Sequence, residues 1–406
     1  MRLSRSAAFV LQASIILSFL TGSSAPTPLY AVYQAAWGFS PVTVTLVFGV
    51  YALAVLATLL VAGSLSDHVG RRPVLLVATL LQAVTMIVFA TAGGVGALVV
   101  ARVLQGLATG AAAAAVGAGL LDLDRARGTV ANAVVPMLGT ATGSLLGGVL
   151  VQYLPAPTQL VYLVLGAIFV VQAIAITRMP ETVARRPGAL ASLRPQFRLP
   201  PALRPHLLLA APALLAAWAL AGFYGSLGPA MLRQLADSRS LALGGVALFV
   251  LAASGALTVL VLHRQSARTM LTAGTAGLVA GVAITLVASA SGSLAVFFVG
   301  AVLAGAGFGA SFQGGIRSVL PLAPPHERAG VLSILYVIAY LSMGVPAVLG
   351  GLRAVHGGGI AATAREYGIA VILLAGSALV GLLARRAPPL LPQTPGSIGA
   401  RAAQPR

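Results

Sequence analysis

Side chains able to do acid, base or metal chemistry are few in this chain. Its 406 residues include seven acids, five histidines and no cysteine, so thiol chemistry, disulfide bonds and cysteine-held metals are excluded. The histidines lie far apart and form no HxxxH or HxH pair, so no metal site is expected. Every acid falls in a loop or at the end of an apolar run: Asp67, Asp122, Asp124, Glu181, Asp237, Glu327 and Glu366.

One cation does lie inside an apolar run. Arg102 falls within the run from 95 to 120 and is expected to face a partner or a cavity, since an unpaired charge in hydrocarbon is costly. The alternative is that its long side chain reaches the nearer interface. The spans contain no pairing of nucleophile and base, and the chain has no G-x-x-x-x-G-K-[ST] loop. The sequence therefore predicts neither an enzyme nor an ATP-driven pump, and no cofactor.

The elements that must hold these side chains are membrane helices. The chain is 58% hydrophobic and 8% charged, with a mean hydropathy of +0.98, far outside the range of a soluble domain. Barrel-type alternation is absent, so an all-α polytopic membrane protein is predicted. Twelve runs could cross a bilayer, near residues 8 to 30, 42 to 62, 73 to 92, 95 to 120, 128 to 153, 157 to 177, 206 to 230, 240 to 262, 269 to 290, 293 to 320, 329 to 352 and 366 to 384.

The runs divide into two sets of six. The small residues of 101–110 recur in 300–309, which indicates two pseudo-symmetric halves. Such halves suggest alternating access around a site near the membrane midplane. The predicted parts are an N-terminal six-helix half (1–178), a Pro- and Arg-rich cytoplasmic linker (179–205), a C-terminal six-helix half (206–386) and a disordered cytoplasmic tail (387–406).

The formal net charge of +18 comes from arginines scattered between the apolar runs. They are interpreted as topology signals that place both termini and the linker in the cytoplasm, so the lipid bilayer and not nucleic acid is the expected partner. The N-terminus imitates a secretory signal, but Pro26 directly after Ser23-Ser24-Ala25 argues against cleavage. An uncleaved, multi-pass protein of a bacterial cytoplasmic membrane is predicted, as a monomer.

The loop after the second run reads Gly63-Ser64-Leu65-Ser66-Asp67-His68-Val69-Gly70-Arg71-Arg72-Pro73. Its glycines permit a tight turn, and Asp67 and Arg71 are four residues apart, so they could face one partner helix. The loop resembles the G-x-L-[AS]-D-x-x-G-R-[KR] signature of the major facilitator superfamily (MFS), and the resemblance covers essentially the whole chain. It implies the MFS fold of twelve transmembrane helices in two six-helix halves.

Two further stretches resemble signatures of the same superfamily. Arg102, Gln105 and Gly106 match its R-x-x-Q-G motif, which implies a role for Arg102 in proton coupling. The superfamily often pairs the loop arginine with an acid at the end of the fourth span. Asp122 takes that place, so the resemblance implies a cytoplasmic gate formed by Gly63, Asp67, Gly70, Arg71, Arg72 and Asp122.

The fifth run carries Gly139, Gly143, Gly147 and Gly148, which resemble the antiporter motif G-x-x-x-G-P-x-x-G-G with Ser144 in place of the proline. Glycine-mediated helix packing explains this run nearly as well. Candidates for a substrate cavity are polar or aromatic side chains deep in the runs, although interfacial anchoring explains Tyr30 and Tyr224 at least as well. They are Gln12, Tyr30, Tyr51, Gln172, Trp218, Tyr224, Gln313, Tyr336 and Tyr340.

The resemblance implies a secondary active transporter that moves a small organic molecule by alternating access, with proton-coupled efflux as the first expectation. Proton relays usually use a mid-membrane carboxylate, and none is visible in the runs. Coupling must therefore use an unusual group, or the protein is a facilitator. Uptake of a sugar or metabolite is the alternative within transport, and a membrane sensor of the same fold is the alternative outside it.

Overall fold

The computed structural model describes residues 2–195, 197, 199–324 and 327–384, and within these ranges the regular structure is entirely helical. The all-α fold class is therefore confirmed. The predicted disordered tail, 387–406, and the last two residues of the predicted C-terminal half, Arg385 and Arg386, lie outside the described residues.

The first half contains eight helices in the order of the chain, and two of them are short. They are α1 (Arg5–Ser24), α2 (Pro26–Trp37), α3 (Pro41–Ala62), α4 (Ser66–Val69), α5 (Arg71–Ala90), α6 (Val95–Leu123), α7 (Arg125–Tyr153) and α8 (Leu160–Ile176).

The segment between the halves contains two single-turn 3-10 helices, and a third lies inside the second half. The remaining elements are η1 (Ala191–Leu193), η2 (Pro201–Leu203), α9 (Arg204–Ser226), α10 (Gly228–Leu235), α11 (Leu241–Leu262), α12 (Ala267–Ser291), α13 (Leu294–Val319), η3 (Leu320–Leu322), α14 (Arg328–His356) and α15 (Gly359–Ala384).

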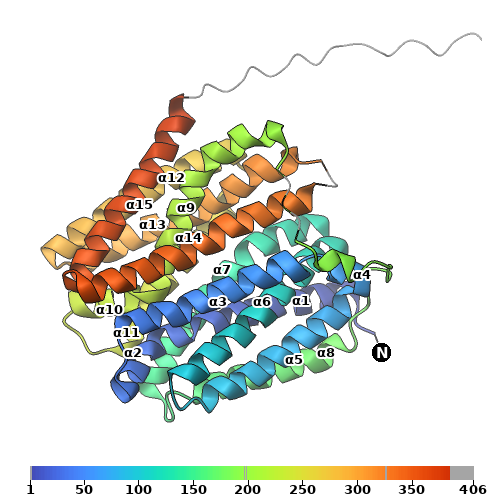
Figure 1. The fold of residues 1–406 in the computed structure, drawn as a ribbon, viewed down its shortest axis with the longest axis horizontal. Coiled ribbons are helices and arrows are strands. Elements are labelled where there is room, and N and C mark those ends of the chain that lie inside the picture. Colours follow the sequence, from blue (N-terminus) through green and yellow to red (C-terminus); the bar gives the residue numbers. More distant parts are fainter. Residues whose placement is uncertain (1, 196, 198, 325–326, 385–406) are drawn as a thin grey trace, which may run out of the picture.

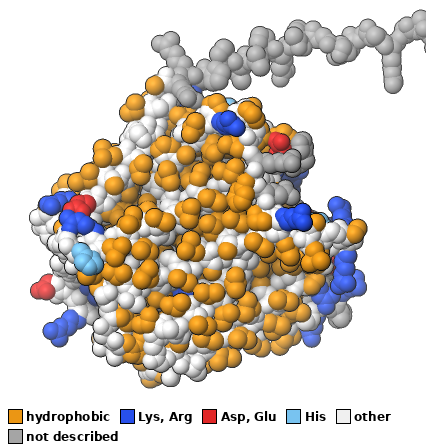
Figure 2. All heavy atoms as spheres, in the orientation of Figure 1, with side chains coloured by type: hydrophobic (Ala, Val, Ile, Leu, Met, Phe, Trp, Pro, Cys, Tyr) orange, Lys and Arg blue, Asp and Glu red, His pale blue; other side chains and the backbone are white. Residues whose placement is uncertain are grey.

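Eleven helical segments of the described chain are long and apolar enough to cross a membrane, and α1 and α2 together make the first of them. The helix α8 is apolar but only 17 residues long, which is the short end of the range that spans a bilayer. With α8 included, the described chain has the twelve spans that the sequence predicts. Figure 2 shows apolar side chains over the middle of the surface and charged ones towards its edges, as a lipid-embedded bundle requires.

Two predicted boundaries were wrong. The first span runs from Arg5 to Trp37 and not from 8 to 30, because it continues as a second helix after a break at Ala25. The last span begins at Gly359, seven residues before Glu366. Glu366 can lie within this helix because its carboxylate pairs with Arg353 at 2.7 Å.

The breaks between α1 and α2 and between α9 and α10 occupy equivalent places in the two halves. Proline has no amide hydrogen and so removes a helical hydrogen bond to the carbonyl four residues earlier. Pro26 leaves the carbonyl of Gly22 without this partner, and Pro229 does the same for Gly225. Each break therefore exposes a backbone acceptor that a side chain can bind.

The repeated glycines hold equivalent helix pairs together in the two halves. A side chain at any of these positions would collide with the carbonyl of the facing helix, so the helices can approach this closely only with glycine there. Gly106 and Gly110 of α6 lie against the carbonyls of Tyr51 and Val55 on α3, and Gly305 and Gly309 of α13 lie against those of Leu251 and Gly255 on α11.

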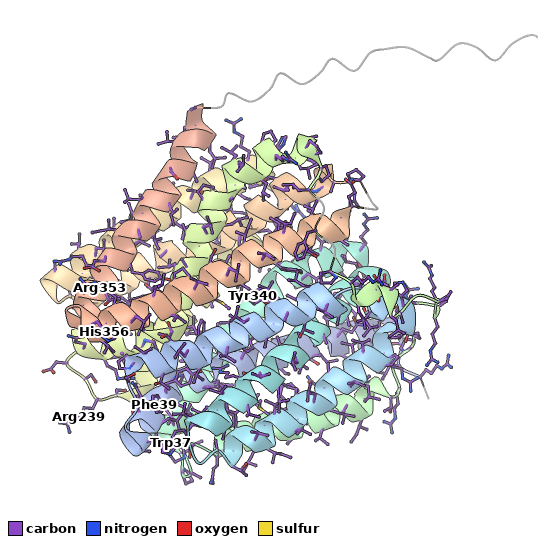
Figure 3. All side chains as sticks on the ribbon, viewed as in Figure 1. Trp37, Phe39, Arg239, Tyr340, Arg353 and His356 are labelled. Carbon is purple, nitrogen blue, oxygen red and sulfur yellow. The ribbon has the colours of Figure 1, made fainter. Side chains whose placement is uncertain are left out.

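The halves pack side by side, with α3 against α14 and α7 against α11 (Figure 1). We call the end of the bundle near α4 and the segment after α8 the linker end. The opposite end, where Figure 3 labels Trp37, Arg239, Arg353 and His356, is called the far end.

Candidate functional site

The acids and the arginine of the signature loop meet at the linker end. Arg71 at the start of α5 forms ion pairs with Asp67 of α4 and with Asp122 near the end of α6, the latter at 3.3 Å. Its Nη1 also donates to Ser66 Oγ at 2.6 Å. The Arg71 side chain is only 7% exposed, whereas Asp67 is half exposed. The expected contacts are thus present, but all three charged residues belong to the first half.

A fourth charge, which the sequence analysis did not assign to this site, comes from the segment after α8. The Glu181 carboxylate accepts hydrogen bonds from the amides of Arg71 at 2.8 Å and Arg72 at 3.1 Å. It therefore caps the start of α5, where the helix dipole favours a negative charge. Gly70 has a φ of +102° and would bring any side chain onto this carboxylate. An acid shortly after an apolar run was the only sequence signal.

The rest of the linker follows Glu181 over the same loop. Thr182 donates to Asp122 at 3.1 Å, and the amide of Arg186 donates to the carbonyl of His68 at 2.9 Å. Ser64, one residue after the C-cap Gly63 of α3, donates to the carbonyl of Ser192 at 3.1 Å. The linker is thus docked on the signature loop through several separate hydrogen bonds.

Arg102 and Gln105 of α6 bind the break in the first span. Gln105 Nε2 donates to the carbonyl of Gly22 at 2.9 Å, and Arg102 Nη1 donates to the carbonyl of Ser23 at 2.8 Å. Arg102 Nε donates to the hydroxyl of Tyr30, on the other side of the break, at 3.0 Å. Arg102 therefore joins α1 to α2, and Gln105 replaces the hydrogen bond that Pro26 cannot make.

The surroundings of Arg102 are neutral and aromatic. Its side chain is 0% exposed, so the interpretation that it reaches an interface was wrong. Its guanidinium carbon lies 5.3 Å from the ring centre of Tyr51 and 5.7 Å from that of Phe89, within the range of cation–π attraction. Among the described residues it has no carboxylate partner. Within the described part of the chain, Arg102 is thus stabilised by neutral acceptors and ring faces.

The glycines of α7 bring it onto α1. Gly139, Gly143 and Gly147 lie against the carbonyls of Leu17, Thr21 and Ala25 in turn. Thr21 and Ser24 donate back to the carbonyls of Gly139 and Thr140. Gly148 instead faces the second half, against Ala242 and Gly245 of α11. This glycine face therefore holds α1 near its break and also contributes to the contact between halves.

Some of the predicted cavity residues come together in the middle of the bundle. Trp218 of α9 lies 5.0 Å from Phe312 and 5.5 Å from Tyr340, measured between ring centres. Tyr336 lies 6.5 Å from Tyr340, and both pack against the hydrophobic cluster around Tyr51 of α3. The indole nitrogen of Trp218 is buried without a hydrogen-bond acceptor in the described chain. We call Tyr51, Trp218, Phe312, Tyr336 and Tyr340 the aromatic cluster.

Other predicted cavity residues lie elsewhere. Gln12 donates to Met179 Sδ at 3.6 Å and Gln172 donates to Ser18 at 2.9 Å, both inside the packing of the first half. Tyr224 lines a cavity of about 20 Å³ between α9, α12 and α15, which has room for about one water molecule. Tyr30 and Tyr224 are both buried, so interfacial anchoring was wrong for them. Gln313 is partly buried beside Phe312.

Comparisons with known proteins agree with this architecture. The sequence profile of the Major Facilitator Superfamily matches residues 13–268. The Tetracenomycin C resistance and export protein of Streptomyces glaucescens is 35% identical over 136 residues, which are 30% of this chain and 25% of that protein. The matched part thus spans a quarter of the length of this curated relative.

Solved transporter structures share the fold. The bacterial homologue of the human lysosomal transporter Spinster, in an inward-facing and occupied conformation, has a TM-score of 0.71 at 14% identity, covering 93% of this chain and 96% of that one. The nucleoside transporter NupG has a TM-score of 0.65 at 11% identity, covering 93% and 98%. The profile match extends over more than half of the chain, and the chain therefore belongs to the Major Facilitator Superfamily, whose members are transporters and not enzymes.

Proposed function

We propose that this protein is a secondary transporter that exports a small organic molecule from a bacterial cell by alternating access, driven by protons. The observation that carries the proposal is the meeting of the two proline breaks at the far end. Thr27, one residue after Pro26, donates to the carbonyl of Gly225 at 3.3 Å. That carbonyl is the acceptor freed by Pro229, so the breaks of the two halves bind each other.

Other contacts support closure of the far end in this conformation. Gln152 at the end of α7 accepts from the amide of Leu241 at 2.8 Å, and α2 packs against α10 and α11. By contrast α6 and α13, whose residues are all described, have at most a marginal contact with each other. Closure at one end with separated α6 and α13 is the arrangement expected of a transporter open towards its linker end.

The distribution of arginines supports a cytoplasmic linker end. Arg71, Arg125, Arg127 and Arg186 lie at or beside this end, together with Arg5. Basic residues near the ends of spans favour the cytoplasmic side. A substrate path that opens at the linker end then faces the cytoplasm, from which an exporter takes its substrate.

Similarity to an exporter and the charged groups of the first half support the direction and the driving ion. The curated relative is named a resistance and export protein. The buried Arg102 and Gln105 match the motif that the superfamily associates with proton coupling. Asp67, Asp122 and Glu181 meet around Arg71 at the linker end, which opens and closes in alternating access. We assign proton exchange to these three carboxylates. A facilitator is the second candidate, since no acid of the described chain lies near Arg102.

Everted membrane vesicles test this function. An exporter accumulates its substrate in such vesicles when the interior is acidic, and a protonophore abolishes the accumulation. The vesicles are tested with a panel of planar aromatic dyes and sugars. The Asp67→Asn variant, at the same expression level as the wild type, shows whether accumulation depends on this carboxylate. Flux that only equilibrates the substrate across the membrane, with or without the protonophore, indicates a facilitator. Accumulation that survives the protonophore contradicts proton coupling, and absence of accumulation across the panel contradicts export.

A further inference from the structure

A cavity of about 220 Å³, partly open to solvent, lies between the halves at the far end. Its walls come from α2, α3, α9, α10 and α15, so it exists only while the two halves are in contact there. The polar groups on its walls are Thr27, Tyr30, Gln34, Ser226 and Arg233.

Arg233 is the only charged residue on these walls. Its Nη1 is buried and has no hydrogen-bond partner, and no ion pair of Arg233 is found in the described chain. A second arginine at the same end, Arg353, is paired with Glu366 at 2.7 Å although both side chains are 44% exposed. The half-buried arginine thus lacks the counter-ion that the exposed one has.

The neutral wall groups are mostly committed to other partners. Thr27 donates to Gly225, Ser226 donates to Gly222 at 2.7 Å, and the Tyr30 hydroxyl accepts from Arg102. They cannot replace a counter-ion for the guanidinium. Leaving a partly buried charge without a counter-ion is unfavourable, and a carboxylate is its best-fitting partner because the two groups match in a planar, two-bond geometry.

We propose that this cavity binds a small organic monocarboxylate, with Arg233 as the counter-ion of its carboxylate. The volume suits an anion of about the size of benzoate, since a cavity of roughly 150 Å³ holds benzene. Because both halves form the walls, the bound anion stabilises the closed far end. It also contacts Tyr30, which Arg102 holds at the first break.

The test is a titration of the purified protein with benzoate by calorimetry, with benzyl alcohol as the neutral analogue of the same size. The proposal expects saturable binding of benzoate and none of benzyl alcohol at the same concentrations. In Arg233→Gln the affinity for benzoate falls roughly thirtyfold or more, as is typical when one partner of a buried charge pair is removed. The matched control Arg239→Gln, an exposed arginine of the same end, leaves binding unchanged.

Equal binding of the two compounds, or equal loss in both arginine variants, overturns the proposal. Thermal unfolding provides a second readout that does not depend on transport. Without added anion, Arg233→Met should melt at a higher temperature than the wild type, because it removes a partly buried charge that has no counter-ion in the described chain. Benzoate should raise the melting temperature of the wild type and not that of Arg233→Met. A wild type that melts higher than Arg233→Met without anion contradicts the account.

Discussion

Gln105 Nε2 donates to the carbonyl of Gly22 at 2.9 Å, and this is the carbonyl for which Pro26 has no amide hydrogen. The glutamine of the R-x-x-Q-G motif therefore replaces a missing helical hydrogen bond inside the membrane. The adjacent Arg102 binds both sides of the same break. Beyond it, α2 makes the far-end contacts with the second half, so these two side chains fix the part of the first span that closes the far end.

Removing the amide of Gln105 tests this relationship. Gln105 Oε1 also accepts from Arg102 Nη1 at 2.7 Å. Gln105→Leu therefore leaves the Gly22 carbonyl without a donor and removes one acceptor of Arg102, which is expected to cost about 1–3 kcal/mol and to reduce transport. The matched control is Gln82→Leu, because Gln82 is equally buried at 0% exposure and neither of its amide atoms has a partner. Thermal unfolding should separate the two variants, and equal destabilisation would count against the role of Gln105.

The glycine face of α7 predicts a strongly position-dependent effect of alanine. At Gly143 a methyl group would collide with the carbonyl of Thr21 and with Ser24 Oγ, so Gly143→Ala should destabilise the protein by about 1–3 kcal/mol. At Gly117, also within a helix, a methyl group meets open space, and Gly117→Ala should stabilise by about 0.4–1 kcal/mol. Unfolding of both variants in one detergent provides the comparison.

Docking of the linker on the signature loop predicts a change in proteolysis. Glu181→Gln weakens the cap on α5 because a neutral amide binds helix amides less strongly than a carboxylate does. Trypsin should then cut after Arg185 or Arg186 severalfold faster than in the wild type. Glu327→Gln, an acid at the linker end with no contact to this loop, serves as the control. An unchanged cutting rate in Glu181→Gln would show that the cap does not hold the linker.

The aromatic cluster predicts a preference for planar aromatic substrates. Trp218→Leu removes stacking surface and the free indole donor, and should weaken the apparent affinity for such a substrate by roughly tenfold. Trp218→Phe keeps an aromatic ring and loses the indole donor, so its affinity for the substrate should lie between those of the wild type and Trp218→Leu. Trp37→Phe at the far end should have no effect on affinity. Concentration-dependent accumulation in everted vesicles measures all three variants.

Hydrophobicity and the family signatures were sufficient to predict the membrane fold and the pairing of Arg71 with Asp67 and Asp122, since these depend on run length and on short motifs. They could not predict which acceptors Arg102 and Gln105 find, because those carbonyls lie far away in sequence and belong to a broken helix. The signal was nevertheless present: Pro26 and Pro229 each remove one amide at equivalent places of the two halves. From the sequence alone, Pro26 was used only as an argument against cleavage, and nothing was drawn from Pro229.

The side chains Gln12 and Gln172 illustrate the other limit of sequence reasoning. Both are polar and deep in apolar runs, which favours a cavity, yet both lie within the helix packing of the first half. Periodicity does not separate a polar residue that faces a cavity from one that faces a neighbouring helix when spans are apolar on all sides. Glu181 was not assigned to the site for a similar reason, since its partner amides lie in another span.

Spin-label distances at the two ends test the central claim most directly, and the absence of cysteine allows label sites to be introduced without background. Thr129→Cys with Gln265→Cys spans the linker end, and Gln159→Cys with Ala361→Cys spans the far end. On addition of a transported substrate or a change of pH, alternating access predicts that one distance shortens while the other lengthens. Two distances that stay fixed, or that change in the same direction, would contradict it.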